Sequence, residues 1–464
     1  MAARSRFFPL QALTLATLTL LASGCALTRT PYSAPEPAVP AQWDTPSPAA
    51  ASIEHWWTRF DDPTLSALVD EALRRNADMA VAALSVKQAQ LAAELADNNR
   101  WPVPSASLSS SSQRAINPAG TRSQTHSVSA GVSWEVDLWE RLAALNDAAQ
   151  WEALATEQDR QATALSLAGT VAEDYWQLAY LNQRVASAQA SLDYAQRTRE
   201  LVKAQYEAGA VSGLDLQQAE QTVLSQQASV SALVEQRSEA RHALVLLFDH
   251  APSTAALAGL LPQEPQTLPD RPLPAVAAGV PAEVLGRRPD LRAAELRLRE
   301  TLASNDAAAA AYYPTLSLTG ALGSSSNALS NLLSNPVGTL GAGLTLPFLR
   351  VREMHLSKAK NQAAYESAVI GYRQTLYSAL ADVQNALSNR EALAHQGEWL
   401  AGSLAAARQV EALTEVRYRH GAVALKDWLD AQERRRTAEV ALAENQLSRL
   451  QNQVTLYQAL GGGV

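Results

Sequence analysis

The side chains of this sequence that could carry chemistry are two carboxylates, Asp427 and Asp430, and one thiol, Cys25. The two aspartates stand three positions apart in "KDWLDAQ", so on a helix they share one face, one turn apart. Two carboxylates this close repel one another and favour cations, or they belong to a solvated face in which Asp430 pairs with Arg434. The sequence contains no HExxH, no phosphate-binding loop and no G-x-S-x-G. We therefore predict that the protein is not an enzyme and needs no metal or other cofactor.

Cys25 is the only cysteine, which excludes an intramolecular disulfide. It follows an export signal made of Arg4, Arg6, an apolar run over 7–21 and the small residues of "LASGC". We expect residues 1–24 to be removed; losing two arginines and no acid changes the net charge from −8 to −10. The ending resembles a bacterial lipobox, which implies a covalent lipid on Cys25 that anchors the chain. Ordinary secretion is the alternative.

The sequence contains two copies of the elements that must position Asp427 and Asp430. The stretch "QYEAGAVSGLDLQQAE" at 205–220 returns as "RYRHGAVALKDWLDAQ" at 417–432, an offset of 212 residues. The same offset relates Pro102 to Pro314 and Gly131 to Gly343. We predict a tether over 25–61, a first repeat over 62–248, a Pro-rich connector over 249–282 and a second repeat over 283–464. Each repeat should read helix, two strands, long helix, tight turn and return helix.

Four segments alternate between apolar and small polar residues, which is the two-residue period of a strand. They are predicted at about 103–113, 125–136, 315–324 and 338–348, and each is about as long as a tilted membrane strand. A flexible Ser-rich linker is the alternative, but a linker would not alternate so regularly. After the signal no run of about 18 apolar residues occurs, so any crossing of a membrane must use these strands.

Two long segments without proline, about 138–206 and 354–419, are predicted to be helices. In the first, Val171, Leu178, Val185 and Leu192 are spaced by sevens, as in a coiled coil. About 68 residues at 1.5 Å each give a length of roughly 100 Å. A first helix is expected to start at Pro63 and continue to about Asn99, and return helices are expected at about 214–248 and 425–460.

A sheet of four membrane strands has two open edges, and unpaired backbone groups are costly in hydrocarbon. Several chains must therefore share one closed sheet. Two copies would give eight strands and three would give twelve, and the pattern alone does not choose. The polar face suits water; its residues include Ser127, Ser129, Ser133, Ser317 and Thr319. A mildly acidic chain without a Lys/Arg block is a poor partner for nucleic acid.

The sequence resembles the outer-membrane factor family of TolC-like channels. Four features carry this resemblance: the segment "WWTRFDDPTLSALVDEAL", the lipobox, the duplicated strand pairs and the two Y-x-x-G-A-V turns. The resemblance is to the lipoprotein branch serving efflux pumps of the resistance–nodulation–division type. It implies a mainly α fold with a small sheet, in which helical hairpins form a trimeric α-barrel and four strands per chain build a twelve-stranded transmembrane β-barrel. A girdle is built from the terminal and Pro-rich segments.

The resemblance also implies a function and its partners. The homotrimer would lie in the outer membrane of a Gram-negative bacterium, in contact with its lipid, and extend into the periplasm. It would bind a periplasmic adaptor and an inner-membrane pump, and conduct small toxic compounds or drugs passively to the exterior. Ala26, in place of an Asp after the cysteine, implies sorting to the outer membrane.

Within this family the two turns are the periplasmic tips. The implied adaptor contacts are Gly209, Ala210, Val211, Gly421, Ala422 and Val423; the alternative is that the glycines only reverse a helix. Asp427 and Asp430 match the aspartates that ring the closed periplasmic constriction. Val423 stands opposite Asp215 where relatives carry an Arg, so an inter-helix lock must use Arg417, Arg419 or Tyr418.

Two further readings and one local departure remain. The same architecture supports a type I protein-secretion duct, and a lipid-anchored coiled-coil scaffold without a pore represents another class. The segments "DLWERLAA" and "LPFLRVRE" lack the Gly that the family places after a strand, so we expect the strand-to-helix bends to differ.

Overall fold

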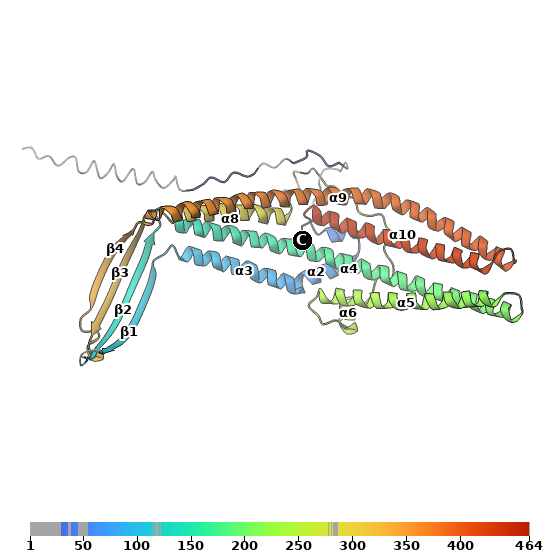
Figure 1. Ribbon diagram of the computed structural model, residues 1–464, viewed down its shortest axis with the longest axis horizontal. Coiled ribbons are helices and arrows are strands. Elements are labelled where there is room, and N and C mark those ends of the chain that lie inside the picture. Colours follow the sequence, from blue (N-terminus) through green and yellow to red (C-terminus); the bar gives the residue numbers. More distant parts are fainter. Residues whose placement is uncertain are drawn as a thin grey trace, which may run out of the picture. The chain divides into compact units, whose positions relative to one another are not determined.

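The computed structural model describes residues 29–35, 39–44, 54–114, 116, 120, 122–276, 278–279, 281 and 286–463 (Figure 1). The signal segment and Cys25 lie outside this range. The chain forms two compact units. The sheet unit comprises 1–37, 84–158 and 293–375, and the hairpin unit comprises 38–83, 159–292 and 376–464. Each unit draws on both halves of the sequence, so the sequence repeats do not coincide with the compact units.

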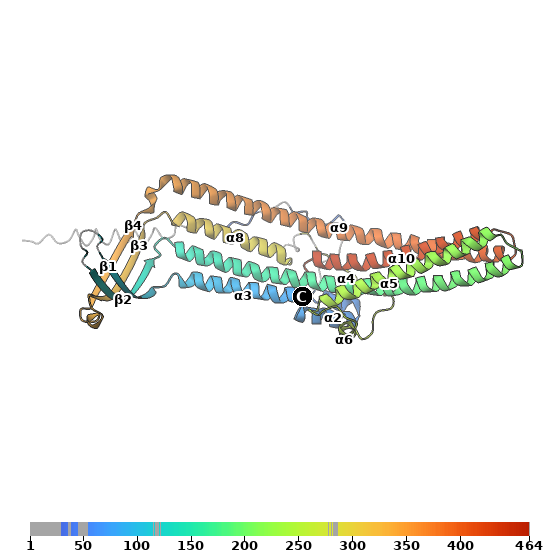
Figure 2. The same ribbon diagram turned by 60° about the horizontal axis from the view of Figure 1, so that its bottom comes forward.

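The 212-residue offset reappears in the element bounds. Helix α3 (Ala77–Asn98) matches α8 (Pro289–Ala310), and strand β1 (Val103–Arg114) matches β3 (Thr315–Ser326). The long helix α4 (Arg141–Glu207) matches α9 (Val351–Arg419), and the return helix α5 (Gly213–Leu246) matches α10 (Leu425–Ala459). The α4–α5 and α9–α10 hairpins have their turns at the same end (Figure 2). No described helix has a stretch that is both long and apolar enough to cross a membrane.

The first helix differs from the expectation of one continuous segment up to about Asn99. It is two helices, α2 (Pro63–Arg75) and α3, because Asn76 between them is extended, with ψ of 136°. The Oδ1 of Asn76 accepts hydrogen bonds from the backbone N–H of Asp78 (2.9 Å) and Met79 (3.2 Å). Its Nδ2 donates to the carbonyl of Leu247 at 2.9 Å. An Asn cap thus starts a new helix and fastens it to the end of α5.

The four strands form one antiparallel sheet in the order β1-β2-β3-β4, with β2 (Arg122–Val136) and β4 (Val337–Thr345) completing the two pairs. Strand β4 is shorter than expected: it ends at Thr345, and a 3₁₀ turn, η4 (Pro347–Leu349), follows. Pro347 has no N–H to donate, which explains the early end. A second such turn, η3 (Leu329–Asn331), lies in the β3–β4 loop.

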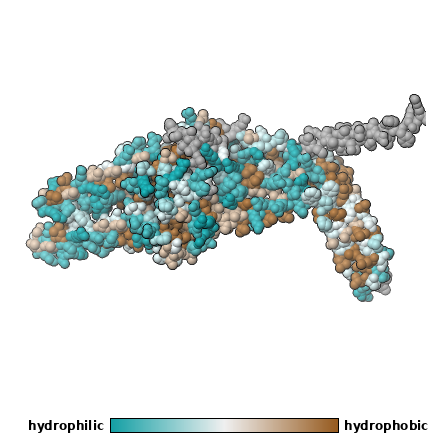
Figure 3. All heavy atoms as spheres, turned by 180° about the vertical axis from the view of Figure 1, so that it is seen from behind, coloured by the Kyte–Doolittle hydropathy of each residue, from teal (hydrophilic) through white to brown (hydrophobic). Residues whose placement is uncertain are grey.

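The register gives the sheet two chemically distinct faces. On one face Leu108 lies opposite Val128, and Trp134 opposite Leu318. On the other face the hydroxyls of Ser107 and Ser129 are 2.8 Å apart, and those of Ser109 and Ser127 are 2.7 Å apart. Hydrophobic side chains are exposed along the strands in Figure 3, and Leu340 is 93% exposed. An apolar face that no described residue covers indicates an environment other than water.

The hairpin unit has an aromatic core that ties the two ends of the chain together. Trp56, in a 3₁₀ turn η2 (Trp56–Phe60), stacks on Tyr457 with ring centroids 5.3 Å apart. Phe60 meets Trp176 edge-on at 4.7 Å. The Pro-rich connector carries the short helix α6 (Thr254–Leu260), whose Leu257 is buried in this core. Truncating a buried aromatic of this kind costs about 3–5 kcal/mol.

Candidate functional site

Each helical hairpin turns at a glycine in the left-handed region. Gly209 has φ of 74° and Gly421 has φ of 70°. The amide of Ala210 donates to the carbonyl of Gln205 at 2.8 Å, and Ala422 donates to Arg417 at the same distance. The bonds are those of a Schellman motif, which ends a helix at a glycine. The turns are therefore duplicated in conformation as well as in sequence.

The two tips differ in which of their residues face water. Val211 and Val423 pack against a shared cluster, and the backbone and small side chains of Gly209, Ala210, Gly421 and Ala422 remain exposed. The cluster consists of Val202, Ala219, Tyr418, Leu425 and Trp428. The valines thus hold the two hairpins together, and the surface open to a partner at each tip is made of glycine and alanine.

The two carboxylates after the second turn have different surroundings. Asp427 caps its own helix, because its Oδ2 accepts the backbone N–H of Ala424 at 3.2 Å. Asp215 does the same after the first turn, accepting the backbone N–H of Ser212 at 2.9 Å and its hydroxyl at 2.6 Å. The side chain of Asp430 is exposed and bonds to no described residue, so the alternative interpretation of a pair with Arg434 is not observed. The charge of Asp430 therefore stabilises no neighbouring part of the described structure.

The hairpins are joined near the tips by two tyrosines. The Tyr418 hydroxyl donates to the Gln205 Oε1 at 2.8 Å, and the Tyr418 ring stacks on Trp428 at 5.1 Å. Burial, with the charge of Asp215, raises the pKa of Tyr418. Farther from the turn on α4, the Tyr194 hydroxyl donates to Glu415 Oε2 at 3.0 Å, and burial raises the pKa of Tyr194. Both phenols remain neutral donors.

The structure thus shows which side chains link the two hairpins near the tips. Tyr418 bridges the hairpins, but its partner is Gln205 and not Asp215, whose carboxylate is used for capping. Arg419 forms an ion pair with Glu415 on its own helix. Gln205 and Tyr194 were both missed in the sequence: Tyr194 lies outside the repeated stretch, and Gln205, the first residue of that stretch, is replaced by Arg417 in the second copy. The only available signal was that Gln205 stands one residue before the repeated Tyr206.

The strand-to-helix bends differ between the two repeats. After β2, Glu140 takes the left-handed conformation with φ of 56°, and Asp137 caps α4 through the amides of Leu142 and Ala143. After β4 the bend is the 3₁₀ turn η4. The N-terminal segment 29–32 meets the first bend: Arg29 Nε donates to Glu140 Oε2 at 2.8 Å and Arg29 Nη1 lies 3.0 Å from Asp147.

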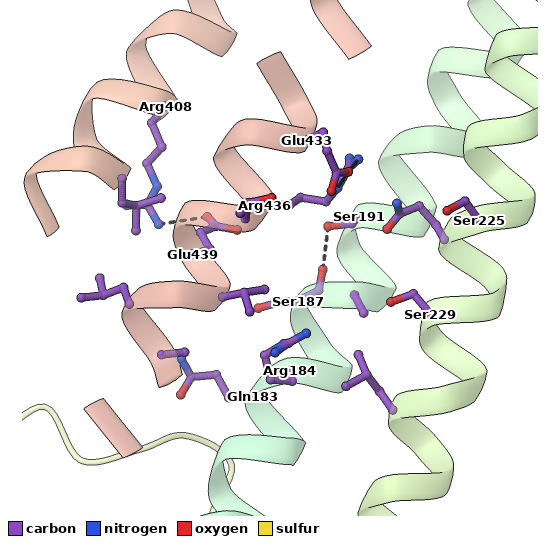
Figure 4. Close-up of a pocket in the computed structure, with 18 of the residues that line it drawn as sticks. Gln183, Arg184, Ser187, Ser191, Ser225, Ser229, Arg408, Glu433, Arg436 and Glu439 are labelled. Carbon is purple, nitrogen blue, oxygen red and sulfur yellow. Dashed lines mark hydrogen bonds and ion pairs between the residues drawn. The ribbon is translucent and has the colours of Figure 1, made fainter. Parts of the chain in front are cut away.

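Between the hairpins lies a cavity of about 580 Å³. Figure 4 shows hydroxyls on α4 and α5, among them Ser187, Ser191, Ser225 and Ser229. Its arginines already have acidic partners: Arg408 lies 3.1 Å from Glu439, and Arg436 is paired with Glu433. A wall of hydroxyls and neutralised charges can hold water but presents no nucleophile with a base. No group of three or more His, Cys, Asp or Glu that could hold a metal occurs in the described residues.

Two antiparallel hairpins with exposed tips, on a chain that also carries a sheet with an apolar and a hydroxylated face, define the class of TolC-like outer-membrane channels. Comparison with known proteins agrees. The family described as "Outer membrane efflux protein" matches residues 68–248 and 280–462, so the chain belongs to this family. The predicted family, the mainly α fold with a small sheet, and the role of an outer-membrane efflux channel are thereby confirmed.

Individual relatives are similar along nearly their whole length. The chain is 32% identical to the pyoverdine export outer membrane protein OpmQ of Pseudomonas putida, covering 92% of each protein. It is 31% identical to the antibiotic efflux pump outer membrane protein ArpC of the same species, covering 97% of this chain and 95% of the relative. The solved outer-membrane channel OprN superposes with a TM-score of 0.84 at 27% identity, over 94% of this chain and 99% of that structure.

Proposed function

We propose that three copies of this chain form the passive outer-membrane outlet of a tripartite efflux system. The observation that carries the proposal is the four-stranded sheet, whose edge strands β1 and β4 pair with no described residue on their outer side. Sister copies would pair these edges into a twelve-stranded closed sheet, with the hydroxylated face around water and the apolar face against lipid. Planar-bilayer conductance of the purified protein tests this, and a monomeric species without conductance would refute it.

A covalent lipid on Cys25 anchors the chain in this proposal. The support is the "LASGC" ending of the export signal. Labelled palmitate should enter the wild-type protein in cells, and Cys25→Ser should abolish the incorporation. Labelling that persists in this variant would argue against the anchor.

The tips are the surface that a periplasmic adaptor would contact, and the adaptor would connect them to an inner-membrane pump. The exposed Gly209–Ala210 and Gly421–Ala422 pairs leave room for close backbone approach. Relatives are named for export of pyoverdine and for antibiotic efflux. We accordingly propose small organic compounds as substrates. Gly209→Asp or Gly421→Asp should weaken cross-linking to the adaptor in cells while the trimer remains intact.

The gate is proposed to be a ring of Asp430 and Asp427, three copies of each, around the periplasmic neck. Crowded carboxylates repel one another and attract cations. Asp430→Asn should raise single-channel conductance and weaken block by trivalent cations. Because Asp430 makes no capping bond, the substitution should leave the stability of the protein unchanged. Asp427→Ala should likewise raise conductance and weaken block, and it should also lose the oxygen that accepts the Ala424 N–H, at a cost of about 1 kcal/mol.

Asp215→Ala is the matched control for the gate. It removes the equivalent cap in the first hairpin, where Asp215 accepts two bonds from Ser212. We expect it to lower the melting temperature but to leave cation block as in wild type. If Asp430→Asn leaves both conductance and block unchanged, the proposed gate is wrong while the channel itself stands.

A further inference from the structure

The outer end of the β1–β2 hairpin carries two arginines in direct opposition. Arg114 lies opposite Arg122 in the last residue pair of β1 and β2, next to the loop that joins these strands. The Ser110–His126 pair lies four pairs further into the sheet. Residues directly opposite one another on antiparallel strands place their side chains on the same face. Both arginines therefore lie on the same face as Leu108 and Val128, beyond the polar pairs Ser110–His126 and Ser112–Gln124 that follow the apolar part of this face. Like charges in this position repel each other unless an anion lies between them.

No group in the surrounding chain can supply that anion. Residues 103–134 contain no Asp or Glu, and residues 307–349 contain no charged residue at all. The Arg122 Nε donates to the Ser112 hydroxyl at 3.2 Å, which satisfies a donor but neutralises no charge. Sister copies in the proposed trimer carry the same sequence, so their strands cannot supply a carboxylate either.

The position of the pair along the strand matches a membrane surface. At the other end of the same face stands Trp134, whose Nε1 donates to the carbonyl of Arg100 at 3.0 Å. Trp134 and Arg122 are separated by about 12 residues, or roughly 40 Å along the strand. A tilt of about 45° reduces this to about 28 Å. The face is apolar from Trp134 to Val128, and the polar part that follows, with His126 and Gln124, leads to the level of the headgroups. Aromatic residues favour one interface, and the arginines would reach the other.

We propose that Arg114 and Arg122 bind the phosphate of a lipid headgroup in the outer leaflet. This inference rests on the proposed function, because the sheet must span the outer membrane. Arginine suits the role, since its planar guanidinium donates two parallel hydrogen bonds to phosphate oxygens. Ile116, which is 99% exposed at the loop tip, would contact the adjoining lipid surface. A phosphate between the arginines removes their repulsion and fixes the height of the sheet in the membrane.

The test measures binding of diphosphorylated lipid A and of its dephosphorylated form to the full chain purified in detergent. Wild type should prefer the phosphorylated lipid, and Arg114→Gln/Arg122→Gln should bind it at least about tenfold more weakly. Binding of the dephosphorylated lipid should be the same for both. Millimolar inorganic phosphate should not displace the lipid. Equal binding of the two lipids, an unchanged affinity of the variant, or full displacement by inorganic phosphate would overturn the proposal.

Arg352→Gln/Arg373→Gln is the matched control, because it removes two exposed arginines from α9. Its affinity for the lipid should equal that of wild type; an equal loss in the control would reduce the effect to net charge and overturn the site. If the Gln variant fails to give the folded oligomer on unheated gels, Arg114→Lys/Arg122→Lys serves instead, with an affinity below that of wild type. Conductance in neutral phospholipid separates the two proposals: a conducting protein without phosphate preference refutes only the lipid site.

Discussion

Asp174 lies half-buried on α4, and burial raises the pKa of its carboxyl from 3.8 to about 6. Burial, reinforced by Asp174, also raises the pKa of the adjacent Glu173. An acid whose pKa is higher in the folded chain binds its proton more tightly there than in the unfolded chain. Stability should therefore be highest below about pH 4 as far as this group is concerned, and fall as the pH rises through about 6.

Asp174→Asn should remove most of this loss. We expect its melting temperature at pH 7.5 to exceed that of wild type, and the difference to vanish near pH 4, in thermal unfolding followed by circular dichroism. Asp193→Asn is the control, since Asp193 is exposed on the same helix. If the difference in melting temperature between wild type and Asp174→Asn is the same at pH 4 and at pH 7.5, the expectation is wrong.

At the scale of elements, the bend between β2 and α4 stores strain in one residue. Glu140 has φ of 56°, a conformation that costs a residue with a Cβ about 1 kcal/mol or more relative to glycine. Its carboxylate is held by Arg29 of the segment that follows Cys25. The ion pair fixes the side chain while the backbone remains strained, so the two effects can be separated by substitution.

Glu140→Ala removes the ion pair and keeps the strain, whereas Glu140→Gly removes both. We expect the glycine variant to be more stable than the alanine variant by about 1 kcal/mol in denaturant unfolding. Glu152, inside α4, provides the comparison: there alanine should be the more stable by about the same amount, because glycine weakens a helix interior. The same order of stability at both positions would show that the bend is unstrained.

The elements that the sequence predicts best are those governed by a local period. The alternation around Val128 and Ser129 identified the strands and their two faces, and the 212-residue offset identified the duplicated hairpins. The break at Asn76 was missed because the apolar period continues through it and its partner, the Leu247 carbonyl, is remote in sequence. For the same reason the Tyr418–Gln205 bond and the capping task of Asp427 appear only in the folded chain.

At the scale of the whole molecule, the repeat is a unit of sequence but not of folding. Strand β2 of the first repeat pairs with β3 of the second from His126 to Val136. Trp56, which precedes the first repeat, stacks on Tyr457 near the end of the second. Burying such surfaces supplies most of the stability of a domain, and each repeat alone would leave one side of its sheet and core exposed. Neither repeat should therefore fold by itself.

A split of the chain between Asp270 and Arg271, both exposed in the connector, tests this. Exported alone, residues 1–270 or a signal-bearing 271–464 should be degraded or aggregate, whereas co-expression should give an oligomer whose gel migration changes on heating. The control is the intact chain with a protease site at the same junction, which should remain assembled after cleavage because its contacts form before the cut. A stable, protease-resistant sheet from either half alone would show that one repeat suffices to fold, and that the pairing of β2 with β3 only joins two independent halves.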